Sequence, residues 1–155
     1  MERLFAVLSL AGLLLMVGCG LTGPGARITS VKYVETIPTE GSVYYSFEGK
    51  RIIKMVLSFR FDDTLAAGLD PKSDESSKTL YAELVKGAHF YHGNEVIEPT
   101  YGFWPKKFGK NFATDMSLFY VIPSNPPAGS LRFVFDTSLL GKGASALDTV
   151  IRPTK

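Results

Sequence analysis

Apolar and polar residues alternate with a period of two along much of this chain. The clearest example is residues 51–62, where every second side chain is apolar. The apolar positions are Ile53, Met55, Leu57, Phe59 and Phe61, and the positions between them are Lys54, Val56, Ser58, Arg60 and Asp62. Because successive side chains of a strand point to opposite faces, this pattern predicts a strand with one buried face.

The same alternation predicts strands elsewhere. Residues 116–122 and a return strand at 131–135 form a second pair, with Met116, Leu118, Tyr120 and Ile122 on one face of the first and Leu131, Phe133 and Phe135 on one face of the second. Residues 27–37 predict a first strand with a bulge near Val31. Residues 147–153 predict the last strand, which Pro153 ends.

The stretches between these strands predict loops and turns. Residues 65–78 contain a proline, several acids and serines, which predict a long exposed loop with a short helical turn near 64–69. Residues 79–99 predict a strand, a kink near Gly87 and a hairpin with its tip at 92–95. We expect no internal repeat and no amphipathic helix of three turns.

About eight short strands separated by turns predict an all-β fold, an antiparallel β-sandwich. Uneven strand lengths and long loops favour the Greek-key connections of a sandwich. A lipocalin-like barrel is the second choice, and it would call for more regular hairpins and a helix near the end. Residues 28–155 form the single predicted domain, since the chain is too short for two comfortable ones.

The amino end carries a different pattern, an apolar run over residues 4–17. Its length of about 14 residues is short of the ~20 that a spanning helix needs, and it suits the core of a secretory signal. The run ends in Met16-Val17-Gly18-Cys19, which resembles the lipobox of bacterial lipoproteins. That resemblance implies cleavage before Cys19 and a lipid on its sulfur, with Met16 standing where the family prefers leucine.

The resemblance divides the amino end into a signal peptide at 1–18 and a lipidated cysteine with a flexible, glycine-rich tether at 19–27. It implies attachment to the cell membrane or the outer membrane, with the domain facing the periplasm or the exterior. Two or more acyl chains hold a protein firmly on a bilayer. Cys19 is the single cysteine of the chain, so no internal disulfide is expected.

A second resemblance concerns the fold. Residues 118–151 contain an apolar strand, a proline–glycine turn, a Leu-x-Phe-Val-Phe-Asp strand, a polar loop and a short last strand. This order resembles the closing strands of small immunoglobulin-like sandwich domains in bacterial lipoproteins and secreted antigens. The resemblance implies an immunoglobulin-like sandwich. It carries no reaction and no functional residue.

The net charge and the reactive side chains of the sequence argue against nucleic-acid binding, a metal site and enzyme activity. The formal net charge of +2 gives no reason to expect nucleic acid as a partner. His89 and His92 are weak candidates for a metal or hydrolytic site, because residues three apart on a strand face opposite sides. The spacing of the acids between Asp62 and Glu75 matches no EF-hand loop, and solvated loop acids are the favoured interpretation. We therefore expect no enzyme activity and no cofactor.

The segment 101–112 combines aromatic rings with lysines. The candidate binding surface consists of Tyr101, Phe103, Trp104, Lys106, Lys107 and Phe108. Such a surface can stack on sugars or peptides, and Trp and Tyr often dominate binding energies. The alternative is that the rings close one open end of the sandwich as a core plug. The sequence leaves both alternatives open.

The leading hypothesis is a membrane-anchored envelope lipoprotein that acts as a non-enzymatic binding module. Its partner would be an envelope protein, a glycan or a host surface. One alternative is a carrier of a lipid or another small apolar ligand, held between the sheets or inside a barrel. Another is a metal-binding or hydrolytic protein that uses His89 and His92.

Overall fold

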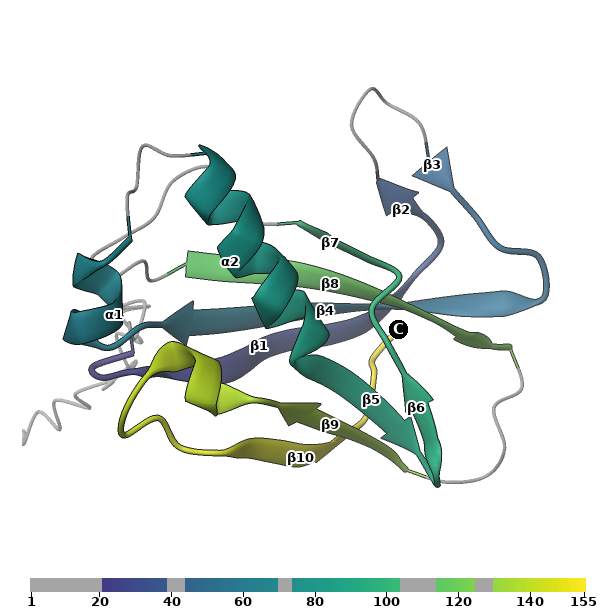
Figure 1. Ribbon diagram of the computed structural model, residues 1–155. Helices are drawn as coiled ribbons and strands as arrows, with labels where there is room; N and C mark the ends of the chain where they lie inside the picture. The colour runs from purple at the N-terminus through teal and green to yellow at the C-terminus, as the bar shows by residue number, and fades with distance from the viewer. Residues whose placement is uncertain (1–20, 39–43, 70–73, 104–113, 125–129) are drawn as a thin grey trace, which may run out of the picture.

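Two antiparallel four-stranded sheets face each other in this protein, as a computed structural model shows over residues 21–38, 44–69, 74–103, 114–124 and 130–155 (Figure 1). The first sheet has the order β1 (Gly25–Val34), β4 (Lys50–Arg60), β8 (Thr114–Pro123), β7 (Tyr101–Phe103). The second has the order β10 (Leu147–Ile151), β9 (Leu131–Phe135), β5 (Ala88–His92), β6 (Glu95–Ile97). The sheets do not close into a barrel, so the predicted sandwich is confirmed.

Shorter elements complete the described chain. They are a ribbon of β2 (Ile37–Pro38) and β3 (Tyr44–Tyr45), the helices α1 (Asp63–Ala67) and α2 (Asp74–Lys86), and the 3-10 helix η2 (Thr137–Leu140). Antiparallel pairing joins β2 to β3. The short helix α1 confirms the helical turn expected near 64–69.

The strand order is that of an immunoglobulin-type sandwich. In that fold the strands A, B, E and D form one sheet and C, F and G the other, with extra strands beside C. Here β1, β4, β8 and β7 take the places of A, B, E and D, and β6, β5, β9 and β10 take those of C′, C, F and G. The topology therefore matches the expected sandwich, without the paired cysteines of antibody domains.

The core lies between the sheets and follows the alternation of the sequence. Ile53, Met55, Leu57 and Phe59 of β4 are at most 1% exposed, as are the inward residues of β8. At the centre the Phe90 ring lies 4.1 Å from the Tyr120 ring and 5.4 Å from the Phe133 ring, measured between centroids. Edge-to-face contacts of this kind add to the gain from burial.

Helix α2 corrects the prediction for residues 74–86, which were expected to form the end of a loop and a strand. Its residues Leu80, Tyr81, Leu84 and Val85 all contact the core. Their spacing is helical, since residues three and four apart share a face of a helix. Lys86 in the last turn suits the helix dipole. The helix ends before Gly87, where the predicted kink falls.

A second correction concerns β8 and β9, which were expected to form a pair. They lie in different sheets: β8 pairs with β4 and β7, and β9 pairs with β5 and β10. Both strands have a buried apolar face, because β8 faces the core from the first sheet and β9 faces the same core from the second. Alternation alone does not distinguish such strands from hairpin neighbours.

A smaller apolar cluster lies on the outer face of the first sheet, beneath the ribbon of β2 and β3. Ile37, Ile52 and Phe119 are each at most 2% exposed there, and Val34, Tyr101, Phe103 and Val121 pack around them. Ile52 and Phe119 occupy the positions opposite to the main core on β4 and β8. The ribbon therefore gives the first sheet a second apolar layer.

Strand β1 begins earlier than expected. It starts at Gly25, inside the segment 19–27 that the sequence assigns to a tether. Leu21 is also held, because the Arg60 Nη1 donates a hydrogen bond of 2.7 Å to its carbonyl oxygen. The register of β1 on β4 shifts between Ile28 and Ser30, which places the bulge close to its expected position at Val31.

Candidate functional site

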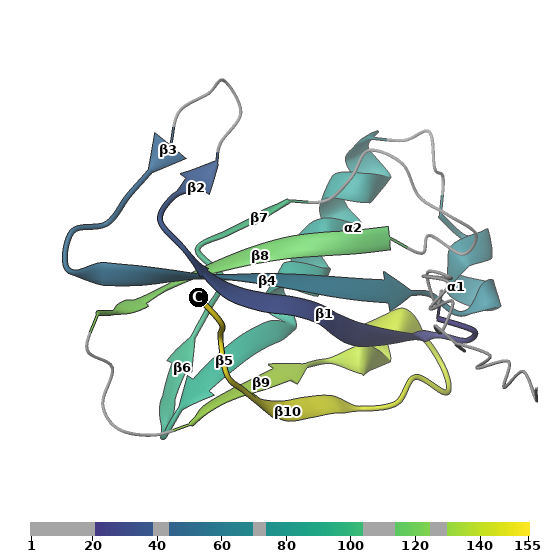
Figure 2. The ribbon, with the colours of Figure 1, turned by 180° about the vertical axis from the view of Figure 1, so that it is seen from behind.

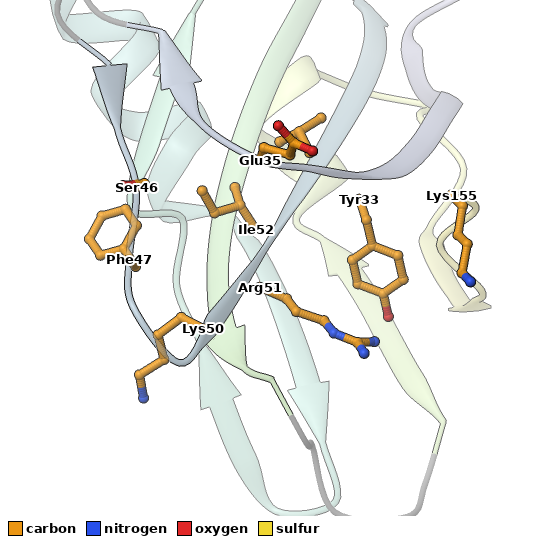
Figure 3. A pocket seen from close by; sticks show the side chains of 9 residues that line it. Tyr33, Glu35, Ser46, Phe47, Lys50, Arg51, Ile52 and Lys155 are labelled. Atoms are coloured by element: carbon orange, nitrogen blue, oxygen red, sulfur yellow. The ribbon is translucent and has the colours of Figure 1, made fainter.

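A surface hollow of about 440 Å³ lies where β1 leads into β2 and β3 leads into β4. We call it the neck hollow. Its lining consists of Tyr33, Val34, Glu35, Ser46, Phe47, Lys50, Arg51, Ile52 and Lys155. Figure 3 shows the Arg51 side chain directed toward the Tyr33 ring, with Phe47 and Lys50 to one side and Lys155 to the other.

The hollow arises because the two chain segments that connect the β1–β4 ladder to the β2–β3 ladder, here called arms, differ in length. The β1–β4 ladder ends at the pair Val34–Ile52, and the β2–β3 ladder begins at Ile37–Tyr45. Between the ladders, one arm is residues 35–36 and the other is 46–51. The longer arm has to loop outward, and it turns at Gly49, whose φ of 67° suits glycine. The Lys50 N–H donates to the Phe47 carbonyl oxygen at 3.1 Å within this turn.

The neck hollow carries three cationic side chains and one carboxylate. The Arg51 guanidinium carbon lies 5.4 Å from the centroid of the Tyr33 ring, a cation–π distance that fixes where this charge sits. Lys50 and Lys155 are exposed, and so is Glu35. Within the described part of the chain, none of these four charged groups joins an ion pair.

Backbone hydrogen bonds bring Lys155 to the hollow from the far end of the sequence. The Tyr33 N–H donates to the Thr154 carbonyl oxygen at 2.8 Å, and the Thr154 N–H donates to the Val31 carbonyl oxygen at 3.2 Å. This short parallel bridge places residues 153–155 beside the end of β1. The position of the Lys155 charge therefore depends on the pairing of Thr154.

A second hollow, of about 420 Å³, shares Tyr33 with the first. It is lined by His92, Ser130, Leu131, Ile151, Arg152 and Pro153 besides Tyr33. Arg152 is exposed, so a fourth cation lies at this end of the sandwich. The two hollows together define a basic end. The junction of β1 with β2 and the chain after β10 lie opposite the end that carries α1 (Figure 2).

The predicted binding surface at 101–112 is described only in part. Tyr101 and Phe103 lie in β7, half-buried, with their ring centroids 4.7 Å apart. The Phe103 ring meets the Phe119 ring edge-on at 5.9 Å. The other predicted members, Trp104, Lys106, Lys107 and Phe108, lie outside the described residues. Tyr101 and Phe103 thus support the outer apolar cluster, and the choice between plug and binding surface stays a prediction.

The two histidines lie on opposite faces of β5. His92 lies on the same face of β5 as the buried Ala88 and Phe90, and it lines the second hollow. His89 lies on the other face of β5, and its ring centroid is 6.4 Å from the ring centroid of Tyr91. Its Nδ1 is buried without a hydrogen-bond partner. Within the described residues, no three His, Cys, Asp or Glu side chains gather closely enough to hold a metal ion.

Of the acids considered for calcium, Asp62 has a structural role. Its carboxylate accepts hydrogen bonds from the backbone N–H of Leu65 at 2.7 Å, capping α1, and of Lys142 at 2.8 Å. These two donors lower the pKa of Asp62 from its usual value, since they stabilise the charged form. Asp70 lies outside the described residues.

The lipobox, including Cys19, also lies outside the described residues, so lipidation stays a prediction. No helix among residues 21–38, 44–69, 74–103, 114–124 and 130–155 is long and apolar enough to cross a membrane. Comparison with known proteins finds no family model, no curated relative and no solved structure that matches this chain. The fold and the hollows must therefore support any functional proposal.

The sequence analysis did not single out the residues of the neck hollow. One local signal was present, the neighbouring cations Lys50 and Arg51 directly after a glycine turn. Tyr33 and Lys155 carry no such signal, because only the bridge between Val31 and Thr154 brings them together.

Proposed function

We propose that this protein is a lipid-anchored module of a bacterial cell envelope that binds a partner through its basic end and catalyses no reaction. Two features support the proposal: the lipobox at Met16–Cys19, and a surface hollow lined by three cationic side chains and one carboxylate. It also accommodates the resemblance of residues 118–151 to immunoglobulin-like domains of bacterial lipoproteins and secreted antigens. The anchoring membrane would be the cell membrane or the outer membrane.

The observation that carries the proposal is the separation of the amino end from the basic end. Leu21 is tied to Arg60 beside α1, whereas the neck hollow lies at the other end of β1 (Figures 1 and 2). Strand β1 has 10 residues, so its ends are about 30 Å apart at ~3.3 Å per residue.

An acyl chain on Cys19 would hold the α1 end close to the bilayer. Cys19 precedes Leu21 by two positions, which span at most about 7 Å of extended chain. The neck hollow would then face away from the anchoring membrane, toward an envelope protein, a glycan or a host surface. A domain in this orientation presents its basic end where a partner can reach it.

Metabolic labelling tests the anchor. Cells that express the wild-type chain or Cys19→Ser are grown with radiolabelled palmitate, and membrane and soluble fractions are compared. The proposal expects label and membrane association for the wild type, and loss of the label with Cys19→Ser. A wild-type protein that carries no label and leaves the membrane without detergent would overturn it.

A further inference from the structure

The neck hollow has the composition of an anion site with an apolar wall. Arg51, Lys50 and Lys155 line it together with the Glu35 carboxylate, and none of the three cations joins an ion pair within the described residues. Several cations that line one surface hollow without ion-pair partners raise the local concentration of anions. Their arrangement therefore favours an anionic group.

Arg51 is the best-positioned of these donors. Its contact with the Tyr33 ring limits the freedom of the guanidinium, so less entropy is lost when an anion binds. The planar guanidinium can donate two parallel hydrogen bonds to one phosphate. Lys50 and Lys155 add single, strongly hydrated charges on either side (Figure 3).

The other wall of the hollow is apolar. Phe47 is 37% exposed, and Ile52 and Val34 line the hollow beside it. Tyr45, at 53% exposure, directly precedes this arm of chain in β3. An inorganic anion makes no use of these surfaces, whereas a ring or short apolar body attached to the anion would cover them.

We propose that the neck hollow binds a phosphate group joined to an aromatic or apolar body, with the phosphate on Arg51 and Lys155 and the body against Phe47, on the side where Lys50 lies. A phosphate carries nearly two negative charges near neutral pH, which fits several cations better than a single carboxylate does. Glu35 supplies one acceptor at the rim, suited to a hydroxyl group of the ligand. This inference rests on the proposed function as a binding module and names the ligand class.

Titration of the full chain in neutral detergent tests the inference, with binding followed by amide NMR shifts or calorimetry. The probes are phenyl phosphate, inorganic phosphate and phenol. Phenyl phosphate is expected to bind most tightly, inorganic phosphate more weakly and phenol barely. Shifts should concentrate at residues 33–35, 46–52 and 154–155. Affinity should fall as salt is added, because exposed charges are screened.

Three variants sharpen the test. Arg51→Gln and Lys155→Gln are each expected to weaken phenyl phosphate binding by about tenfold, the size that a charge-assisted hydrogen bond supports. Phe47→Ala should weaken phenyl phosphate and leave inorganic phosphate unchanged. Lys78→Gln, which removes an exposed charge from α2, is the matched control and should change neither. Lys155 is exposed at the chain's end, so its variant keeps the fold.

Two results would overturn the inference. One is the absence of phenyl phosphate binding, or binding that Arg51→Gln and Lys155→Gln leave unchanged. The other is binding to vesicles of phosphatidylglycerol and phosphatidylcholine that phenyl phosphate does not compete away, which would make the basic end a membrane-docking surface. A chain that is acylated at Cys19 yet binds no phosphate retains the proposed anchor and loses only this inference.

Discussion

The Asp62 Oδ2 accepts a hydrogen bond of 2.8 Å from the backbone N–H of Lys142, 80 residues further along the chain. The Asp62 N–H in turn donates to the Leu140 carbonyl oxygen at 2.8 Å. The same residue caps α1 through Leu65. One side chain thus fastens the end of β4 to the loop that leads into β10, at the end of the sandwich where Leu21 is also held.

Asp62→Ala is therefore expected to lower the melting temperature by several degrees at pH 7. The pKa of Asp62 is lowered in the folded protein, so its contribution is fully present above the ordinary value of 3.8 and is lost as the pH falls through the folded value. The difference between wild type and variant should shrink below about pH 4. Thermal unfolding followed by circular dichroism between pH 2 and pH 7 measures both effects.

Glu98→Ala, at an exposed position without such hydrogen bonds, is the control. It should leave the melting temperature nearly unchanged. If Asp62→Ala melts like the control at pH 7, the link between Asp62 and Lys142 does not contribute to stability.

Gly102→Ala should destabilise the protein by about 1–3 kcal/mol, the usual cost of overpacking. A Cβ at Gly102 would come within 2.0 Å of the Tyr81 hydroxyl oxygen and 3.2 Å of the Leu118 side chain. Tyr81 itself belongs to α2, and its partial burial raises its pKa to about 12. Urea unfolding provides the measurement.

Adding Tyr81→Phe to Gly102→Ala should recover part of the lost stability, because the nearest remaining contact would be at 3.0 Å. Gly23→Ala is a matched control, since nothing lies within 4 Å of its Cβ. Equal stability of Gly102→Ala and Gly23→Ala would contradict the close approach of α2 to β7.

Phe119→Ala tests the second apolar layer under the ribbon. Phe119 is 1% exposed, so its truncation should cost about 3–5 kcal/mol, as for a core phenylalanine. Phe47→Ala, at an exposed ring, should stay within about 0.5 kcal/mol of the wild type. Denaturant unfolding compares the two, and similar small effects at both positions would mean that the ribbon does not bury the outer face.

Arg60→Ala removes the hydrogen bond that holds the Leu21 carbonyl oxygen. The segment 21–24 should then gain motion on the nanosecond timescale, seen as a drop in the heteronuclear NOE of the Thr22 and Gly23 amides. Lys32→Ala is the control, because it removes an exposed cation from β1 itself. Unchanged NOE values in Arg60→Ala would show that other contacts hold the amino end of the domain.

The alternation of the sequence predicts β4 and the inward residues of β8 and β9 well, because a strand with one buried face imposes a period of two. It fails for α2, although Leu80, Tyr81, Leu84 and Val85 recur with helical spacing. The β-forming residues around them suggested a strand, and packing of one helix face on the core decided the outcome.

The neck hollow could not be predicted from the sequence. It depends on two arms of unequal length between ladders and on a bridge that brings Thr154 to β1. Both are properties of strand pairing over long separations. The polar pattern of residues 46–51 indicates a turn and gives no sign that Tyr33 and Lys155 lie nearby.

Energy transfer from the protein to a labelled bilayer tests most directly whether anchorage and binding lie at opposite ends of the domain. A donor dye is attached at Thr64→Cys or at Glu48→Cys in the acylated chain, which has no other free thiol if Cys19 is lipidated. With an acceptor lipid in the vesicles, transfer should be strong from position 64 and several-fold weaker from position 48, about 30 Å further away. Equal transfer from both positions, or stronger transfer from position 48, would contradict the account.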